Sequence, residues 1–339
     1  MSSDTFIAVA ENIHCTLSRK VGGAFARQND DGTGEILYKD GGEAKCVPVP
    51  ECFVKNTDWE NGKVKHIAAA MWQGFYGNGE AQQAGADYVQ YWARLQEAKG
   101  ATYQEINVDE FPAEQDERMK LMTWAAGVVQ EATTLPLSID SSNPDMLRVG
   151  LDACDMSRSK PMVNSVSLER LDAVELAAAA GAVVIAGATG RDEMPNTVEE
   201  RMTNLDELTS ILKGKGFTDA DIHYDPLVFP ISVDGKNGTN VIETVKAIRE
   251  RFGADVHFAP GLSNVSFGMP KRKLINTVFT HMCWQAGLDG AIVDPRHVSQ
   301  ESLQTMDTTT EAYKIAQALL LGEDDFGMNY ITASREGLI

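Results

Sequence analysis

Carboxylates and primary amides stand where several short apolar runs of the sequence end, and these side-chain types could bind a flat heterocycle. The set comprises Glu11, Asn107, Asp140, Asn164, Asp225 and Asn264, with Asn12, Asp109, Asn143, Ser165 and Asp294 beside them. A carboxylate can accept two parallel N–H bonds from an aminopyrimidine edge, while an amide can donate to one ring atom and accept from another. The same side chains could instead cap the rim of a sheet, and for any single residue the two interpretations have equal weight.

Eight apolar runs lead into these residues, and each run predicts a buried β-strand. The runs cover 6–11, 103–109, 135–140, 161–166, 182–188, 221–228, 255–262 and 290–295. Helix-like stretches lie between them, among them 82–99, 114–132, 169–180, 196–213, 239–252, 271–286 and a long last one near 297–321. Eight strand–helix repeats are the number that closes a TIM (β/α)8 barrel, in which side chains at the strand ends carry the chemistry. An open doubly wound sheet is the alternative, but no G-x-G-x-x-G follows the first strand.

The chain is therefore expected to form a single α/β domain over 1–339 with one long insertion. Residues 16–81 separate the first strand from its helix by far more than the usual two to six or so residues. The segment is rich in Gly, Asn and Asp, and it looks too short and too irregular to be a second enzyme domain. At the C-terminal mouth of a barrel it is either a decorative insertion or a lid or docking segment over the site.

Composition narrows the classes of partner. The 339 residues include 49 acidic and 30 basic side chains, a formal charge of −19, which disfavours nucleic acid and anionic membranes as partners. The N-terminal sequence M-S-S-D-T-F-I-A-V-A-E-N has neither the basic region of a signal peptide nor a membrane-spanning apolar length. Five scattered cysteines fit reduced thiols in a cytoplasm. No His or Cys spacing matches a metal site, so no bound metal is predicted.

Four motifs, in order along the chain, resemble the pterin-binding methyltransferase family. They are I-D-S-S-N-P-D-M-L-R-V-G-L-D-A-C, V-N-S-V-S, Y-D-P-L-V and G-L-S-N-V-S-F-G-M-P, supported by E-I-N-V-D-E and the late L-I-N-T-V-F-T-H-M-C-W-Q-A-G. The family includes methyltetrahydrofolate:corrinoid protein methyltransferases and the folate domain of cobalamin-dependent methionine synthase. The resemblance covers roughly 82–295 plus the first strand. It implies a pterin-binding barrel that moves a methyl group between N5 of tetrahydrofolate and the cobalt of a corrinoid.

The resemblance also assigns roles to residues by their positions in these motifs. Asp140 and Asp225 resemble the two aspartates that hold the pterin ring. Asn164 resembles the asparagine that contacts the same ring, and Asn107 is expected to line the pocket. Asn264 is similar to a mobile asparagine that hydrogen-bonds N5, which makes it the candidate catalytic residue, because charge changes at this nitrogen during transfer.

The first strand departs from the family pattern. The family usually has Glu-Arg-Ile-Asn there, whereas this chain reads E-N-I-H, so that Glu11 is retained while Asn12 and His14 replace Arg and Asn. Glu11 is therefore a pterin-site candidate only by retention. The insertion at 16–81 is also atypical, and it could shape the mouth for a particular corrinoid protein.

The chain lacks the cobalamin-ligating signature D-x-H-x-x-G, since D-V-H-F-A-P-G at 255–261 places its glycine one position late. The resemblance then implies that a separate partner protein carries the corrinoid, with tetrahydrofolate or 5-methyltetrahydrofolate as the small-molecule substrate. A stand-alone chain fits corrinoid-dependent demethylation or acetogenic systems rather than methionine synthase. Demethylation, from methylcorrinoid to tetrahydrofolate, is the expected direction, although the reverse direction and the original methyl donor stay open. Relatives are commonly homodimers, so a homodimer is expected.

Two alternatives remain. A dihydropteroate synthase would share the barrel, but it must bind a diphosphate leaving group, and few basic residues stand at the strand ends. A non-catalytic folate-binding module would keep Asp140, Asn164 and Asp225 but would not need Asn264.

Overall fold

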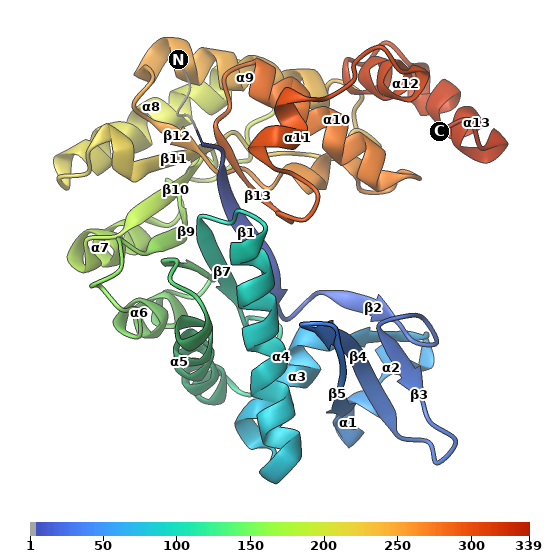
Figure 1. Ribbon diagram of the computed structural model, residues 1–339. Helices are drawn as coiled ribbons and strands as arrows, with labels where there is room; N and C mark the ends of the chain where they lie inside the picture. Colours follow the sequence, from blue (N-terminus) through green and yellow to red (C-terminus); the bar gives the residue numbers. More distant parts are fainter. Residues whose placement is uncertain (1–4) are drawn as a thin grey trace. The chain divides into compact units, whose positions relative to one another are not determined.

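Eight parallel β-strands form the central sheet of the computed structural model, which describes residues 5–339 (Figure 1). They are β1 (Ile7–His14), β7 (Tyr103–Asn107), β8 (Leu137–Asp140), β9 (Met162–Val166), β10 (Val183–Gly187), β11 (Ile222–Asp225), β12 (His257–Phe258) and β13 (Gly290–Val293). Their order in the sheet is β12-β11-β10-β9-β8-β7-β1-β13. Once the insertion is set aside, neighbouring strands follow one another along the chain, except that the last strand, β13, lies beside the first, β1. A bridge between Gly261 and Ile292 continues the pairing from β12 to β13. The predicted TIM (β/α)8 barrel is confirmed.

Two strands are clearly shorter than predicted. The run 221–228 contains only β11 (Ile222–Asp225), and the seventh strand shows the largest difference. The apolar run predicts a strand over 255–262, but β12 holds only His257–Phe258. Pro260 has no N–H to give to a ladder, and the chain then enters the 3-10 helix η2 (Leu262–Ser266). The chain packs as two compact units, residues 10–161 and residues 5–9 with 162–339. The single domain over 1–339 stays a prediction.

Within residues 10–161, the insertion contains regular structure rather than the irregular chain that was expected. It holds β2 (Ser18–Lys20), β3 (Ala26–Gln28), β4 (Gly34–Asp40), β5 (Glu43–Val49), α1 (Glu51–Val54), α2 (Thr57–Glu60), β6 (Lys63–Lys65) and α3 (His66–Tyr76), and it is followed by α4 (Gly79–Ala98). Strands β3, β4 and β5 form an antiparallel sheet, and β2 pairs with β6. The expectation was wrong because glycine-rich turns dominate the composition and hide short alternating strands.

Alternation in β4 and β5 gives this small sheet one buried face. Ile36 pairs with Val47 and Gly34 with Val49 in the ladder, and both valines and Ile36 are buried. Gly34 leaves room for the indole of Trp59, since a Cβ there would lie 2.4 Å from the ring. The sheet therefore has an apolar core of its own.

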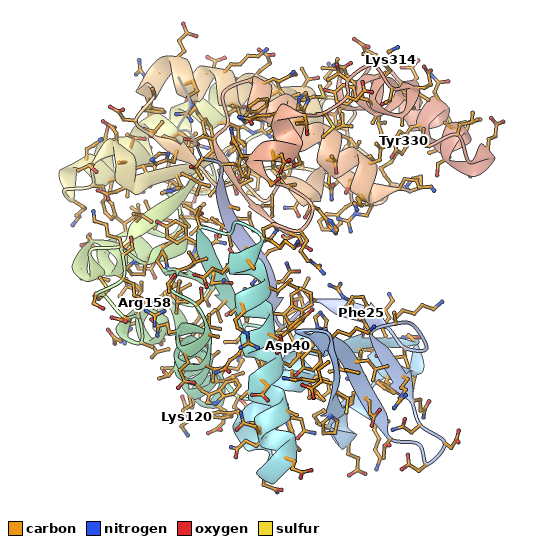
Figure 2. The ribbon with its side chains drawn as sticks, in the orientation of Figure 1. Phe25, Asp40, Lys120, Arg158, Lys314 and Tyr330 are labelled. Atoms are coloured by element: carbon orange, nitrogen blue, oxygen red, sulfur yellow. The ribbon has the colours of Figure 1, made fainter. Side chains whose placement is uncertain are left out.

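Aromatic and charged side chains attach the small sheet to α4. The ring centroid of Tyr38 lies 4.9 Å from that of Tyr88 and 4.9 Å from that of Tyr91. Asp40, labelled in Figure 2, lies at the end of β4. It forms an ion pair with Arg94, with 2.9 Å between carboxylate and guanidinium. The insertion is thus packed against the helix that follows it.

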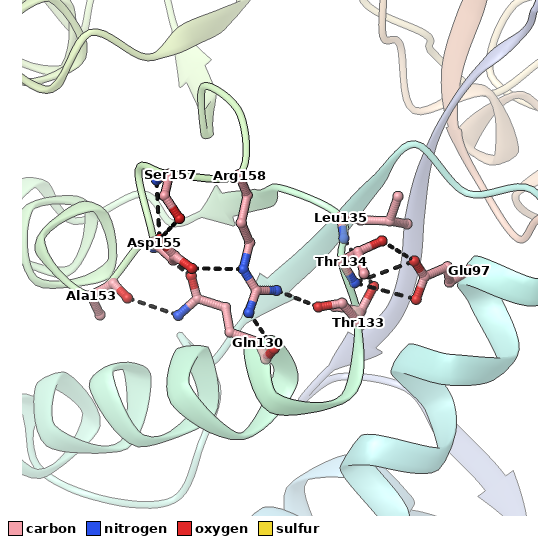
Figure 3. A network of polar contacts seen from close by, with 9 residues as sticks. All are labelled: Glu97, Gln130, Thr133, Thr134, Leu135, Ala153, Asp155, Ser157 and Arg158. Carbon is pink, nitrogen blue, oxygen red and sulfur yellow. Dashed lines mark hydrogen bonds and ion pairs between the residues drawn. The ribbon is translucent and has the colours of Figure 1, made fainter.

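A polar network ties together the loops that lead into β8 and β9 (Figure 3). The Arg158 guanidinium donates to the carbonyl oxygen of Gln130 at 2.6 Å and to that of Thr133, and its Nε donates to Asp155 at 3.0 Å. These bonds satisfy carbonyl groups at the end of α5 (Gln115–Ala132). The network lies before the strands begin, where a barrel gains stability rather than chemistry.

Residues 162–339 alternate the remaining strands with helices, and their C-terminal part is purely helical. The elements are α7 (Leu171–Ala180), α8 (Val198–Gly214), η1 (Asp219–Asp221), α9 (Asn237–Phe252), α10 (Arg272–Gln285), α11 (Gln300–Gln304), α12 (Glu311–Leu320), η3 (Asp325–Gly327) and α13 (Met328–Glu336). The predicted single helix over 297–321 is wrong. Between α11 and α12 the Asp307 carboxylate accepts the backbone N–H of Thr309 at 2.8 Å and its hydroxyl at 2.6 Å, a local turn that competes with helix.

Candidate active site

Asn107 and Asp140 are the two predicted site residues that the structure brings into direct contact. Asn107 ends β7 and Asp140 ends β8, and the Asn107 side-chain N–H donates to Asp140 Oδ2 at 2.9 Å. The backbone N–H of Asp109 donates to Asn107 Oδ1 at 3.1 Å. Because a backbone N–H can bond only to the oxygen, it fixes which way the amide faces. The pair therefore presents Asp140 in a defined orientation, with one oxygen already engaged.

Two further strand-end residues of this unit support the turn after β8 rather than a ligand. The Asp109 carboxylate accepts the hydroxyl of Ser141 at 2.6 Å and the backbone N–H of Ser142 at 2.9 Å. Asn143 is the N-cap of α6 (Pro144–Asp152), and its Oδ1 accepts two backbone N–H groups of the first turn. Both residues were candidates from the sequence, but α6 was not predicted, although an Asn followed by Pro is a typical helix start.

The end of β1 carries Glu11, Asn12 and His14. Glu11 is partly buried within the strand. Asn12 is only 4% exposed, its backbone N–H donates to Gln96 of α4 at 2.9 Å, and its side-chain nitrogen has no hydrogen-bond partner within residues 5–339. His14 lies with its Nε2 3.6 Å from Asp140 Oδ2. His14, noted only as a departure in sequence, is thus the β1 residue that reaches the Asn107–Asp140 pair.

Asp225, at the end of β11, is a carboxylate with few partners. Its Oδ1 accepts the backbone N–H of Leu227 at 2.8 Å. Leu227 itself has a φ of 61°, a left-handed conformation that is uncommon for a residue other than glycine and that clusters at functional sites. Burial raises the pKa of Asp225 to about 6, and the Leu227 N–H and the Arg201 charge offset only part of that cost.

Arg201 is a charged neighbour of Asp225 that sequence reasoning missed. It lies in α8 with no exposed surface, and its Nε donates to the Pro226 carbonyl oxygen at 2.8 Å. One of its terminal nitrogens has no hydrogen-bond partner within residues 5–339. Nothing in the helical pattern distinguishes this arginine from a solvated one, so only the packing of α8 on the turn after β11 could show it.

Asn164 and Asn264 occupy different settings. Asn164 lies within β9, opposite Ile185 of β10, and the Asn164–Ser165 peptide bond is cis. Asn264 lies on η2 rather than at the end of a strand, partly buried, with its backbone N–H 3.3 Å from the Gly261 carbonyl oxygen. Expecting Asn264 at the seventh strand end was therefore wrong in local structure, although η2 follows that strand directly.

Asp294, directly after β13, forms an ion pair within the protein. Arg296 binds both of its oxygens, with Nε at 2.9 Å from Oδ1 and 3.0 Å from Oδ2, and the Arg296 backbone N–H also donates to Oδ1. Burial opposes the charged form, but the hydrogen bonds from Arg296 outweigh it and hold the pKa of Asp294 below its ordinary value. Both oxygens of this carboxylate are therefore bound by Arg296 rather than open to a ligand.

The described residues lack two kinds of feature. Between residues 5 and 339, no group of three or more His, Cys, Asp and Glu side chains could hold a metal ion. Over the same range, no helix combines the length and apolar character required to cross a bilayer.

The fold defines the class of protein, and solved structures share it. Dihydropteroate synthase of Xanthomonas albilineans with 4-aminobenzoic acid has a TM-score of 0.53 at 17% identity, with 67% of this chain and 87% of that chain covered. The enzyme of Vibrio fischeri ES114 has a TM-score of 0.52 at 15% identity, with 72% and 88% covered. At these identities the likeness concerns the fold alone, a TIM barrel.

The sequence relatives identify the family. The model of the pterin binding enzyme family matches residues 81–294. A methylcorrinoid:tetrahydrofolate methyltransferase of Eubacterium limosum is 32% identical over 258 residues, with 74% of this chain and 89% of the relative covered. Methionine synthases of Mycobacterium tuberculosis and Mycobacterium leprae are each 32% identical, covering 51% of this chain but 15% of each relative. The chain belongs to the pterin binding enzyme family, and the resemblance predicted from the motifs is confirmed.

Proposed function

We propose that this protein is a methyltransferase that moves a methyl group between N5 of tetrahydrofolate and the cobalt of a corrinoid carried by a separate protein. The observation that carries the proposal is its 32% identity to a methylcorrinoid:tetrahydrofolate methyltransferase, 89% of which is covered. That relative's name favours transfer from the methylcorrinoid to tetrahydrofolate. A cytoplasmic homodimer is the setting that we propose from the sequence.

Pterin binding is assigned to the carboxylates and amides at the strand ends. Asp140, oriented by Asn107, and Asp225 would each accept N–H groups of the aminopyrimidine edge. Burial raises the pKa of Asp225 because it disfavours the ionised carboxylate. A hydrogen bond from a ligand N–H would stabilise that ionised form. Asn164 and Glu11 are the further candidates for contact with the ring.

Methyl transfer needs control of a proton at N5. In the proposed direction the N5 lone pair displaces the methyl group from the cobalt, which keeps the electrons of the cobalt–carbon bond, and the N5 proton passes to solvent water. The Asn264 amide oxygen can accept a hydrogen bond from N5–H, and in the reverse direction its N–H group can donate a hydrogen bond to N5. The chain's part is to hold N5 in line with the methyl group, and the 16–81 insertion is the proposed docking segment for the corrinoid protein.

The first experiment is a calorimetric titration with tetrahydrofolate and 5-methyltetrahydrofolate under anaerobic conditions. We expect saturable binding of about one folate per chain, weakened at least tenfold or so by Asp140→Ala because a charge-assisted acceptor is lost. Asp152→Ala is the matched control, since Asp152 is an exposed aspartate at the end of α6, the helix after β8. Absence of binding by the unaltered protein to either folate would refute the proposal.

Asn264 separates an enzyme from a folate-binding module. Asn264→Ala should slow methyl transfer in single turnover far more than it weakens folate binding, because its proposed contact matters most where charge changes. Equal losses in binding and transfer would contradict the catalytic role.

A further inference from the structure

The imidazole of His14 lies between the first residue of the insertion and the Asp140 carboxylate. Its Nδ1 is 3.2 Å from the backbone nitrogen and 2.8 Å from the hydroxyl of Thr16, and its Nε2 is 3.6 Å from Asp140 Oδ2. The His14 and Asp140 side chains are 22% and 23% exposed, so both reach the protein surface. All three residues belong to the same compact unit.

The Thr16 backbone selects one tautomer of this imidazole. A backbone N–H can only donate, so the Nδ1 that receives it must be the unprotonated nitrogen. In neutral His14 the hydrogen is then on Nε2, which is the nitrogen that faces Asp140. A tight turn of two residues thereby aims an N–H group at the carboxylate.

The Asn107 side chain is oriented in the same way, by a backbone N–H two residues further along the chain. The Asp109 backbone N–H fixes the Asn107 oxygen, and the Asn107 N–H points to Asp140 Oδ2 at 2.9 Å. Two oriented N–H groups therefore converge on one oxygen of Asp140. Its Oδ1 accepts no hydrogen bond from the residues of 5–339, so it is the oxygen available to a ligand.

We propose that His14, in the tautomer selected by Thr16, is a positioning residue that holds Asp140 with Oδ2 toward the protein and Oδ1 toward a ligand N–H donor. The proposal rests on the proposed function for the nature of that donor, the aminopyrimidine edge of a folate. It gives the insertion a second role besides docking, since its first residue sets the orientation of a carboxylate in the proposed site. The histidine also replaces the asparagine that the resemblance leads one to expect at this position.

The tautomer can be measured without any ligand. In a long-range proton–nitrogen NMR spectrum of protein labelled with 15N-histidine, the signals missing from His14→Gln assign His14. We expect its two ring nitrogens to have well-separated shifts, with the protonated one identified as Nε2. A protonated Nδ1, or rapid averaging of the two nitrogens at neutral pH, would overturn the proposal.

The positioning role is tested by folate titration of four variants. His14→Ala should weaken tetrahydrofolate binding roughly fivefold, a modest loss because the contact is long. His14→Gln should recover most of it, because its amide nitrogen lies near the place of Nε2. Thr16→Pro removes the backbone N–H, so it should weaken binding as His14→Ala does, whereas Thr16→Ser should not.

These outcomes distinguish two failures. If the unaltered protein binds neither folate, the proposed function fails while the NMR result still decides the tautomer. If the unaltered protein binds folate, and His14→Ala and His14→Gln bind it with the same affinity as the unaltered protein, then His14 does not position Asp140. Circular dichroism melting of each variant shows whether it folds, and a Thr16→Pro variant that does not fold leaves the two His14 variants to decide.

Discussion

Two carboxylates of the unit 162–339, Asp225 and Asp289, are held in opposite ways. Asp289, just before β13 begins, is 2% exposed and accepts the backbone N–H of Phe258 at 3.1 Å. It also lies 2.9 Å from His257 Nδ1 and 3.0 Å from the Arg249 guanidinium. Asp225, at the end of β11, accepts one backbone N–H. Asp289, at the start of a strand, is thus surrounded by hydrogen-bond donors and positive charge, whereas Asp225, at the end of a strand, has few donors.

Opposite pKa shifts follow from this difference in pairing. Burial opposes ionisation of Asp289, but His257 and Arg249 outweigh it, so its pKa lies below the ordinary value. Burial dominates at Asp225 and raises its pKa to about 6. The comparison teaches that burial alone does not decide the state of a carboxylate, since the supply of donors decides it. Exchanging each aspartate for asparagine should therefore change stability in opposite directions.

Asp289→Asn should have the largest effect on stability. Removing the charge leaves Arg249 and His257 without their shared partner, and we expect the free energy of unfolding to fall by about 3 kcal/mol. Urea denaturation followed by circular dichroism measures it. Asp255→Asn, an exposed aspartate before β12, is the control and should change stability by less than about 0.5 kcal/mol. Equal effects of the two substitutions would show that the Asp289 cluster contributes nothing.

His223, whose ring centroid lies 5.1 Å from that of His257, makes the same end of the barrel sensitive to acid. Burial, and then the neighbouring His257, lower the pKa of His223 to about 3 from its usual 6.5. A depressed pKa means that its contribution to stability is complete above pH 6.5 and is lost as pH falls towards 3. We expect the unfolding free energy to lose about 1.4 kcal/mol per pH unit from this residue in that window.

Urea denaturation at pH 7, 6 and 5 measures how much His223 contributes to the pH dependence of stability. His223→Gln, which cannot take up the proton, should show a shallower decline than the unaltered protein. His297→Gln, a substitution of a histidine that is 44% exposed, should follow the unaltered protein. Parallel curves for the unaltered protein and His223→Gln would remove His223 as the source.

Asp225→Asn should have the smallest effect on stability and the opposite sign. A raised carboxyl pKa means that stability is complete below about pH 3.8 and is lost as pH rises through 6, so the ionised group costs stability at pH 7. Asparagine avoids that cost while still accepting the Leu227 N–H, and we expect a gain of about 1–2 kcal/mol. Folate binding should weaken about tenfold, because the amide offers one acceptor fewer. A loss of stability in this variant would end the contrast with Asp289.

Strand positions were predictable because a barrel strand buried on both faces is a continuous apolar run, as in β10, where every residue is buried. The candidate residues at strand ends followed from those runs. Contacts that join distant segments were not predictable: the approach of His14 to Asp140 and of Arg201 to the turn after β11 depends on packing. The small sheet of the insertion was missed because its short strands are separated by glycine-rich turns.

The insertion begins with the residue that holds His14, and this has an evolutionary consequence. Replacing the insertion from Thr16 onward would also replace the residue whose backbone N–H orients His14. A single exchange of this segment would therefore alter both a surface segment and the setting of a strand-end side chain. A cut after Thr16 would exchange the segment and leave the imidazole as it is. Chimeras that swap this segment between relatives therefore have a natural junction directly after Thr16.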